Sequence, residues 1–170
     1  MVSALDANTV AQRSWAIRVN LMRVALSVLH HNADAEDAVS TAMLKAYQKA
    51  SSVSREEKLN AWLMRILVLT CYDILKQRKR ETPVDDTRAF EEPIFVGTDG
   101  TIWECIQELP ASYQKVLVLF YYEGFKAREI AQILSIPLGT VLVNLSRGRN
   151  MLKKYFFEVE GVAHSDEQTI

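Results

Sequence analysis

The sequence is poor in the residues that make tight turns, with six glycines and four prolines in 170 residues. A sheet with many short turns is therefore not expected, whereas long helices can run without interruption. No stretch reaches the roughly 18 apolar residues that a membrane-spanning helix needs. The first ten residues lack the basic start and apolar core of a signal peptide. We therefore expect a helical protein that works in the cytoplasm without membrane insertion of its own.

Metal ligands and catalytic groups are also scarce. Cys71 and Cys105 are far apart in apolar helical patterns, so two buried, reduced thiols fit better than a disulfide, although a disulfide remains possible. A structural metal needs about four ligands, and no cluster of His and Cys supplies them. His30, His31 and His164 form no Ser-His-Asp pattern, and no glycine-rich phosphate loop occurs. We predict no metal, no cofactor and no enzyme activity.

A global excess of positive charge is absent as well, because the formal net charge is −1. Any contact with nucleic acid must then come from local clusters of cations. The densest cluster is 76–80, with four cations in five residues at the end of a strongly apolar helical segment. Such cations stabilise the negative end of a helix, and they could equally form a phosphate-binding patch.

Helical periodicity predicts an all-α protein of two small helical domains. The first domain, 11–82, is expected to hold helices over 11–30, 34–50 and 56–80, with Asp34 as an N-cap. The second domain, 101–158, is expected to hold helices over 101–109, 112–122, 126–134 and 138–157, with Gly124 ending one of them at positive φ. Between them, the interrupted and acidic stretch 83–100 reads as a flexible linker.

The segment 129–149 has the pattern of a helix-turn-helix. Ala131 is small where the two helices must approach, and Pro137 follows the turn, where its fixed φ suits a helix start. The second helix of this motif normally enters the DNA major groove. On its outward face Asn144 could read an adenine edge, and Leu142 and Val143 could contact thymine methyls. Alternatively, those two aliphatic side chains could pack against a protein partner.

Together the two groups resemble the sigma-70 family of bacterial RNA polymerase sigma factors, in its short extracytoplasmic-function (ECF) class. The segments 34–39, 44–47, 61–66 and 71–75 look like region two, and 108–110, 122–124, 129–131, 139–141 and 146–149 look like region four. The chain departs from the family pattern at Ser40, Thr41, Leu69, Ser135 and 142–144. Cations or polar contacts are common at several of these positions, and glycine is usual at 135.

The resemblance implies a dissociable promoter-specificity subunit with no enzyme activity of its own. Its partners would be the RNA polymerase core (the β′ clamp helices and the β flap), promoter DNA and an anti-sigma factor. The alternative is a degenerate sigma-like decoy that binds an anti-sigma factor or another protein without productive promoter recognition.

The resemblance also implies a set of site residues in each domain. Core binding would use Asp34, Glu36, Asp37, Ser40, Thr41, Leu44 and Lys45. The −10 element would meet Trp62, Arg65, Leu69, Lys76, Arg78, Lys79 and Arg80, although Trp62 could equally be an ordinary core residue. The −35 element would meet Lys126, Arg128, Thr140, Leu142, Val143, Asn144, Ser146, Arg147 and Arg149.

Overall fold

The computed structural model of the protein describes residues 4–81 and 100–167, and within the second range it describes side chains from 102 to 155. In these ranges the chain is helical and contains no strand, so the all-α expectation is confirmed. The predicted linker 83–100 lies outside the described residues, apart from Gly100. Within the described parts, no single helix is long and apolar enough to cross a membrane, although α7 and the start of α8 pass that test together as a bent pair.

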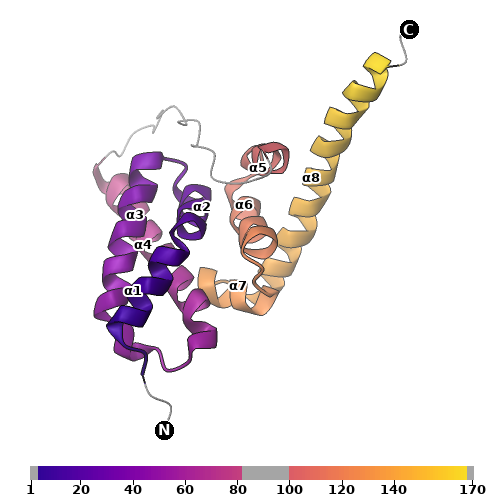
Figure 1. Cartoon of the computed structure of the whole chain (residues 1–170). Helices are drawn as coiled ribbons and strands as arrows, with labels where there is room; N and C mark the ends of the chain where they lie inside the picture. The colour runs from indigo at the N-terminus through magenta and orange to yellow at the C-terminus, as the bar shows by residue number, and fades with distance from the viewer. Residues whose placement is uncertain (1–3, 82–99, 168–170) are drawn as a thin grey trace.

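The N-terminal module consists of four helices that share one core (Figure 1). They are α1 (Ala7–Ala16), α2 (Arg18–Leu29), α3 (Asn32–Gln48) and α4 (Leu59–Glu81), with short 3-10 turns at Ala50–Ser52 and Glu56–Lys58. Helix α4 is central to the packing, because Leu59, Leu63, Met64 and Leu67 are almost fully buried. Small residues of α3, including Ala38 and Ala42, let it approach α4 closely.

Two expectations for this module were wrong. The helix expected over 11–30 begins at Ala7 and breaks at Ile17, which leaves α1 and α2 as separate helices that each pack on α3. The sequence gives no Gly or Pro signal there, so the break follows from packing. The N-cap of α3 is His31, whose Nδ1 accepts the backbone N–H of Asp34 at 3.3 Å. Asp34 therefore lies inside the first turn, as the acidic residue that favours the positive helix end.

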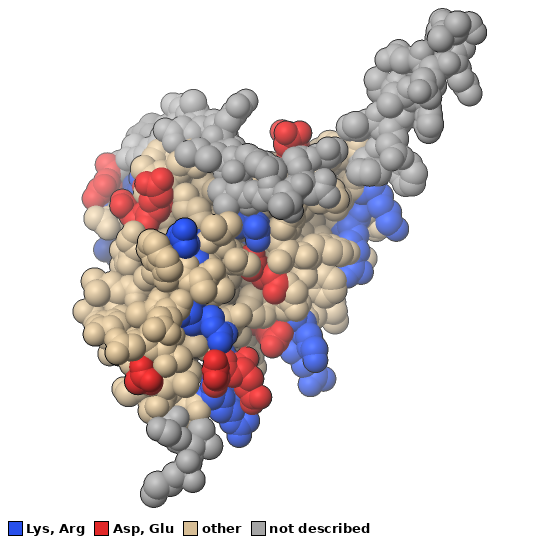
Figure 2. Space-filling view, in the orientation of Figure 1, with Lys and Arg blue, Asp and Glu red and all other residues tan. Residues whose placement is uncertain are grey.

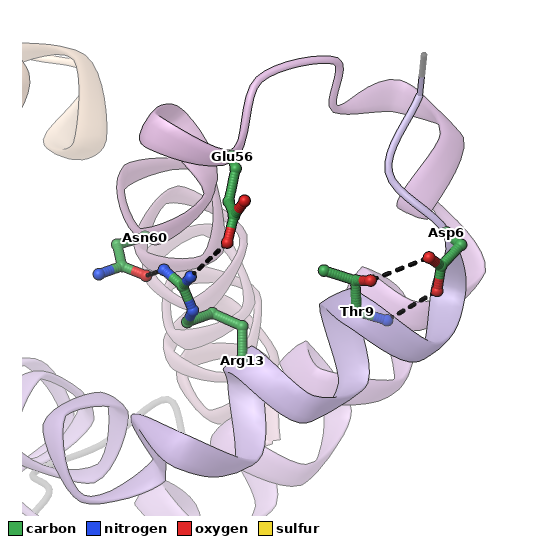
Figure 3. A network of polar contacts seen from close by, with 5 residues as sticks. All are labelled: Asp6, Thr9, Arg13, Glu56 and Asn60. Atoms are coloured by element: carbon green, nitrogen blue, oxygen red, sulfur yellow. Dashed lines mark hydrogen bonds and ion pairs between the residues drawn. The ribbon is translucent and has the colours of Figure 1, made fainter.

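Polar contacts fix where α1 starts and how it meets α4 (Figure 3). Asp6 caps α1 by accepting the backbone N–H of Thr9 at 2.8 Å and its hydroxyl at 2.9 Å. The backbone bond, followed by the hydroxyl bond, lowers the pKa of Asp6 because both favour the carboxylate. Further along α1, Arg13 donates to Glu56 at 2.9 Å and to Asn60 at 3.2 Å. These contacts join α1 to the 3-10 turn Glu56–Lys58 and to the first turn of α4.

The C-terminal module contains α5 (Gly100–Gln107), α6 (Ala111–Leu117), the π-helical segment Val118–Tyr122, α7 (Ala127–Leu134) and α8 (Leu138–Glu167). The helix expected over 112–122 is thus α6 followed by a π-helical turn. Gly124 has φ 71°, which confirms the predicted left-handed end. Helix α8 is the longest and continues beyond the expected end near 157, projecting away from the module (Figure 1).

Candidate nucleic-acid interface

Helices α7 and α8 form the predicted helix-turn-helix. Glu129 accepts the backbone N–H of Lys126 at 2.8 Å, which caps the start of α7. Ser135 ends α7 with φ 56°, a left-handed conformation that glycine adopts at lower cost. The two helices then meet at 110°, within the range typical of this motif. Ile130 and Val141 are fully buried, so the angle is fixed by an apolar core.

The outward face of α8 carries the apolar pair expected from the sequence. Leu142 is 52% exposed and Val143 is 45% exposed, whereas Asn144 is half-buried. Five other residues that were predicted to contact the duplex are also exposed: Lys126, Arg128, Thr140, Ser146 and Arg147. Figure 2 shows Lys and Arg side chains along the outer edge of this module, on the side of α7 and α8. A duplex laid against this edge would meet cations together with aliphatic side chains.

Arg149 has a different environment from Arg147. Its guanidinium lies 5.2 Å from the ring centroid of Phe120 and 5.7 Å from that of Tyr121. Its Nε is buried and has no hydrogen-bond partner among the described residues. Cation–π contacts of this kind hold the side chain against the module. Arg149 therefore helps to fix α8, and Arg147 is the exposed cation of the pair.

Gly148 allows α8 to pack closely on α6. A Cβ at this position would lie 3.0 Å from Leu117 Cδ1 and 3.3 Å from Tyr113 Cβ. We expect Gly148→Ala to change stability little, because a gain of about 1 kcal/mol in helix propensity offsets the crowding. Gly148→Val should lower the free energy of unfolding by about 1–3 kcal/mol through overpacking. Urea unfolding of the two variants checks this, and equal midpoints for both would contradict the close packing.

Helix α4 presents a stripe of residues predicted for the −10 element. Trp62, Arg65, Leu69 and Lys76 follow one another at spacings of three, four and seven residues, which places them on one face. Trp62 is half-buried, Leu69 is 44% exposed, and Arg65 and Lys76 are exposed. At the end of the helix Lys79 and Arg80 are exposed as well. This end combines three accessible cations with the negative end of the helix dipole.

Arg78, the fourth cation of that cluster, is engaged inside the module. Its Nη2 donates to Oδ1 of Asp34, whose side chain is only 8% exposed. His31 Nδ1 lies 3.5 Å from the other carboxylate oxygen of Asp34. Arg78 thus joins the end of α4 to the start of α3. The sequence analysis assigned Asp34 to core binding and Arg78 to the −10 element. In the structure these two side chains form an ion pair with each other.

The remaining residues predicted for core binding lie on one exposed face of α3. Asp37, Ser40, Thr41 and Leu44 recur at helical spacing and are exposed, as is Glu36 beside them. Lys45 is half-buried, and its Nζ lies 3.3 Å from Thr70 Oγ1 and 4.0 Å from Asp73 Oδ2.

A surface groove connects this face of α3 with the end of α4. Its volume is about 470 Å³, and it is lined by Asp34, Asp37, Ser40, Thr41, Ile74, Gln77, Arg78 and Glu81. The groove therefore combines predicted core-binding residues with one predicted −10 residue. Arg78 is thus the predicted −10 residue that lies beside the predicted core-binding residues in this groove.

The cysteines behave as structural residues. Both are free thiols; Cys71 is buried and Cys105 is half-buried, so the expectation that both are buried was wrong for Cys105. Burial raises the pKa of Cys71 to about 12, because the thiolate would lose its hydration. Cys71 is therefore an uncharged core residue. Within residues 4–81 and 100–155, no group of three or more His, Cys, Asp or Glu side chains could hold a metal ion.

Sequence reasoning missed the polar contacts that join the two modules. Glu123 accepts hydrogen bonds from Asn20 at 2.7 Å and from Arg23 at 2.9 Å. Arg65 donates to the carbonyl of Gln132 and to the hydroxyl of Ser135. No local signal in the sequence points to either contact, because each joins residues that are far apart along the chain.

Comparisons with known proteins identify both modules. Residues 16–81 match the family model "Sigma-70 region 2", and residues 99–152 match the model "Sigma-70, region 4". RNA polymerase sigma factor SigV of Bacillus subtilis is 31% identical over 136 residues, covering 77% of this chain and 81% of SigV. ECF RNA polymerase sigma factor SigW of the same organism is 31% identical over 139 residues, covering 71% of this chain and 74% of SigW.

Solved structures agree with that assignment. Sigma factor RpoE, in complex with the anti-sigma factor NepR from Bartonella quintana, superposes with a TM-score of 0.67 at 26% identity. The match covers 84% of this chain and 94% of that one. CnrH, in complex with the cytosolic domain of CnrY, has a TM-score of 0.60 at 19% identity over 88% and 94% of the two chains, which supports the fold alone. The order of the two matched regions and their shared fold show that the chain belongs to the sigma-70 family of RNA polymerase sigma factors.

Proposed function

We propose that the chain is an ECF-type sigma factor that directs the RNA polymerase core to specific promoters. The observation that supports this proposal is that one short chain matches both region 2 and region 4 of the family. The match to SigV also covers 81% of the length of that sigma factor. In this role the chain works in the cytoplasm and acts through binding, as an initiation factor with no reaction of its own. In this proposal, residues 11–82 form the domain that binds the core and the −10 element, and residues 101–158 form the domain that binds the −35 element.

The N-terminal module is proposed to bind the polymerase core and the −10 element. The exposed face of α3, with Asp37, Ser40, Thr41 and Leu44, offers a mixed polar and apolar surface for the β′ clamp helices. On α4, the accessible cations at the end of the helix neutralise phosphates of the melted strand. Trp62 borders that strand and offers a ring on which a base stacks.

The C-terminal module is proposed to bind the −35 duplex through α8 and to contact the β flap. Thr140, Asn144 and Arg147 supply polar contacts, and Leu142 and Val143 meet thymine methyl groups. Lys126 and Arg128 at the start of α7 contact phosphates beside the groove. An aliphatic pair at the centre of the reading face favours T-containing steps, since only thymine presents a methyl group in the major groove.

An anti-sigma factor is the proposed regulatory partner. The solved sigma factor RpoE that resembles this chain was captured with an anti-sigma factor, NepR. The exposed pair Leu142 and Val143 would also be available to a protein that covers α8. Such a partner would compete with promoter DNA for the same face.

Run-off transcription tests the proposed function directly. The full chain, mixed with purified core polymerase and a library of promoter fragments, should yield discrete transcripts that core alone does not produce. A decoy would bind an anti-sigma factor and yield no transcript from any fragment. Sequencing the transcript starts would also define the promoter elements that the two modules read.

A single added cation tests whether α8 is the duplex-facing helix. Leu142→Lys should raise affinity for mixed-sequence duplex DNA about tenfold near 0.1 M salt, because one more phosphate contact steepens the salt slope by about 0.9. Val19→Lys is the matched control, since Val19 is 44% exposed on α2 and gains the same charge. Fluorescence anisotropy against salt concentration measures both. Equal gains in the two variants would contradict a duplex contact by α8.

A further inference from the structure

Arg149 is a partly buried cation without a carboxylate partner. Within residues 4–81 and 102–155, four arginines are half-buried: Arg13, Arg23, Arg78 and Arg149. The first three form ion pairs with Glu56, Glu123 and Asp34, respectively. Arg149 forms no hydrogen bond or ion pair with any described residue, and its Nε is buried. Because a partly desolvated charge is stable only with a partner of opposite sign, an anion from outside the chain is the partner that fits Arg149.

Two aromatic rings of the π-helical segment hold the guanidinium of Arg149 in place. Its Cζ lies 5.2 Å from the ring centroid of Phe120 and 5.7 Å from that of Tyr121. The two rings meet edge to face, with centroids 5.0 Å apart and 77° between their planes. A ring face attracts a cation but does not neutralise its charge. The guanidinium is therefore fixed on the module and keeps its full charge for an external anion.

This cation lies at the edge of the α8 face that is proposed to meet the −35 duplex. Arg149 follows Leu142 by seven residues and Ser146 by three, so these three residues share one side of the helix. Lys153 continues that side one turn later and is exposed. Tyr121 is 52% exposed, so the ring that holds the cation also reaches the surface. A strand that runs beside Leu142 would pass its phosphates along Arg149 and Lys153.

A phosphate of the duplex backbone is the anion that best fits this position. The planar guanidinium matches the geometry of phosphate oxygens and is always charged. Residues 138–155, the part of α8 with described side chains, contain four cations and no acid. This charge attracts a polyanion rather than an isolated carboxylate. Helix α6 and the π-helical segment, which carry no acid of their own over 111–122, add no competing negative charge.

We propose that Arg149 binds a backbone phosphate at the edge of the groove that α8 enters, and that Phe120 and Tyr121 are positioning residues that hold its guanidinium for this contact. The inference rests on the proposed function for the duplex as the ligand. The absence of an acidic partner among the described residues rests on the contacts alone. Duplex binding completes an ion pair whose cation is already in place, so little side-chain entropy is lost when the contact forms.

Arg149→Met tests the phosphate contact in the full chain. Methionine has a similar length and packs well against aromatic rings, so α8 should stay in place while the charge is lost. The salt slope for labelled mixed-sequence duplex DNA should fall by about 0.9, with about an eightfold loss of affinity near 0.1 M salt. Arg18→Met is the matched control, because that guanidinium lies 4.3 Å from the ring centroid of Trp15 in the N-terminal module. Its duplex slope should not change. Fluorescence anisotropy measures both slopes, and urea unfolding checks that both variants are folded.

Variants of Tyr121 test the positioning role. Tyr121→Phe keeps the ring and should bind the duplex as tightly as the original chain. Tyr121→Leu removes the ring and should weaken binding about threefold, because the guanidinium must then be ordered when DNA binds. Adding Tyr121→Leu to Arg149→Met should cause no further loss, since both changes act on one contact. If the two losses multiply in the double variant, Tyr121 acts independently of Arg149 and the positioning role is wrong.

The outcomes separate this phosphate contact from the proposed function. If Arg149→Met unfolds, Arg149→Gln takes its place with the same expected slope. A duplex slope equal to that of Arg18→Met overturns the contact. Weaker binding to core polymerase with an unchanged duplex slope also overturns it, because Arg149 would then meet a carboxylate of a protein. Run-off transcription with the original chain is measured in parallel. If the slope falls as expected but no promoter fragment yields a transcript, the phosphate contact stands and the proposed function fails.

Discussion

Replacing Asp34 with alanine is expected to lower the free energy of unfolding by about 3 kcal/mol. The mutation leaves Arg78 without its carboxylate partner at a half-buried position and removes the acid near the start of α3. Breaking a buried pair from one side typically costs about 3–5 kcal/mol, and the partial exposure of Arg78 places this pair at the lower limit. Urea unfolding at pH 7, followed by circular dichroism, gives the value.

Two further variants show whether the pair causes the loss. Glu36→Ala removes an exposed acid from the same part of α3 and should cost less than about 0.5 kcal/mol. Replacing both partners, as Asp34→Leu with Arg78→Met, should recover much of the stability, because no unpaired charge then remains buried. If Asp34→Ala costs no more than Glu36→Ala, the pair contributes nothing and the role given to Arg78 is wrong.

The helices could be predicted from the sequence because helix formation depends on patterns among residues that are close together in the chain. Apolar periodicity predicted the helices that make up both modules, and Gly124 marked a left-handed end. The exposure of Leu142 and Val143 followed from the phase of α8 once its buried face was set by Val141. The break at Ile17 could not be predicted in this way. No residue there disfavours a helix, and only the packing of α1 on α3 requires the bend.

The candidate site could be predicted only in part, because the tertiary fold decides which charged side chains pair with one another. The sequence places four cations at the end of α4, and the structure shows that one of them, Arg78, is paired with Asp34 inside the module. Arg78 and Asp34 are 44 residues apart, and Arg23 and Glu123 are 100 residues apart. Helical periodicity assigns such residues to one face of a helix, but it does not show which cation pairs with which carboxylate. Ser135 shows the same limit, since its backbone strain was foreseeable and its contact with Arg65 was not.

Neutralising the three accessible cations at the end of α4 is expected to abolish most single-strand binding. The triple variant Lys76→Gln, Lys79→Gln and Arg80→Gln should reduce the salt slope by about two units, since each phosphate contact on a single strand contributes about 0.7. Near 0.1 M salt that change corresponds to about a hundredfold loss of affinity. Stability should change little, because all three side chains are exposed. Anisotropy titrations of a labelled single strand at several salt concentrations measure the slope.

Arg78→Gln is the control that distinguishes a binding cation from a structural one. It removes the same charge from the same cluster, but from a side chain already paired with Asp34. We expect it to lower stability while leaving the salt slope nearly unchanged, the reverse of the pattern for the triple variant. A slope that falls by equal steps at all four positions would mean that Arg78 leaves Asp34 to meet phosphate. Binding would then be coupled to a rearrangement at the start of α3, directly beside the face proposed for the polymerase core.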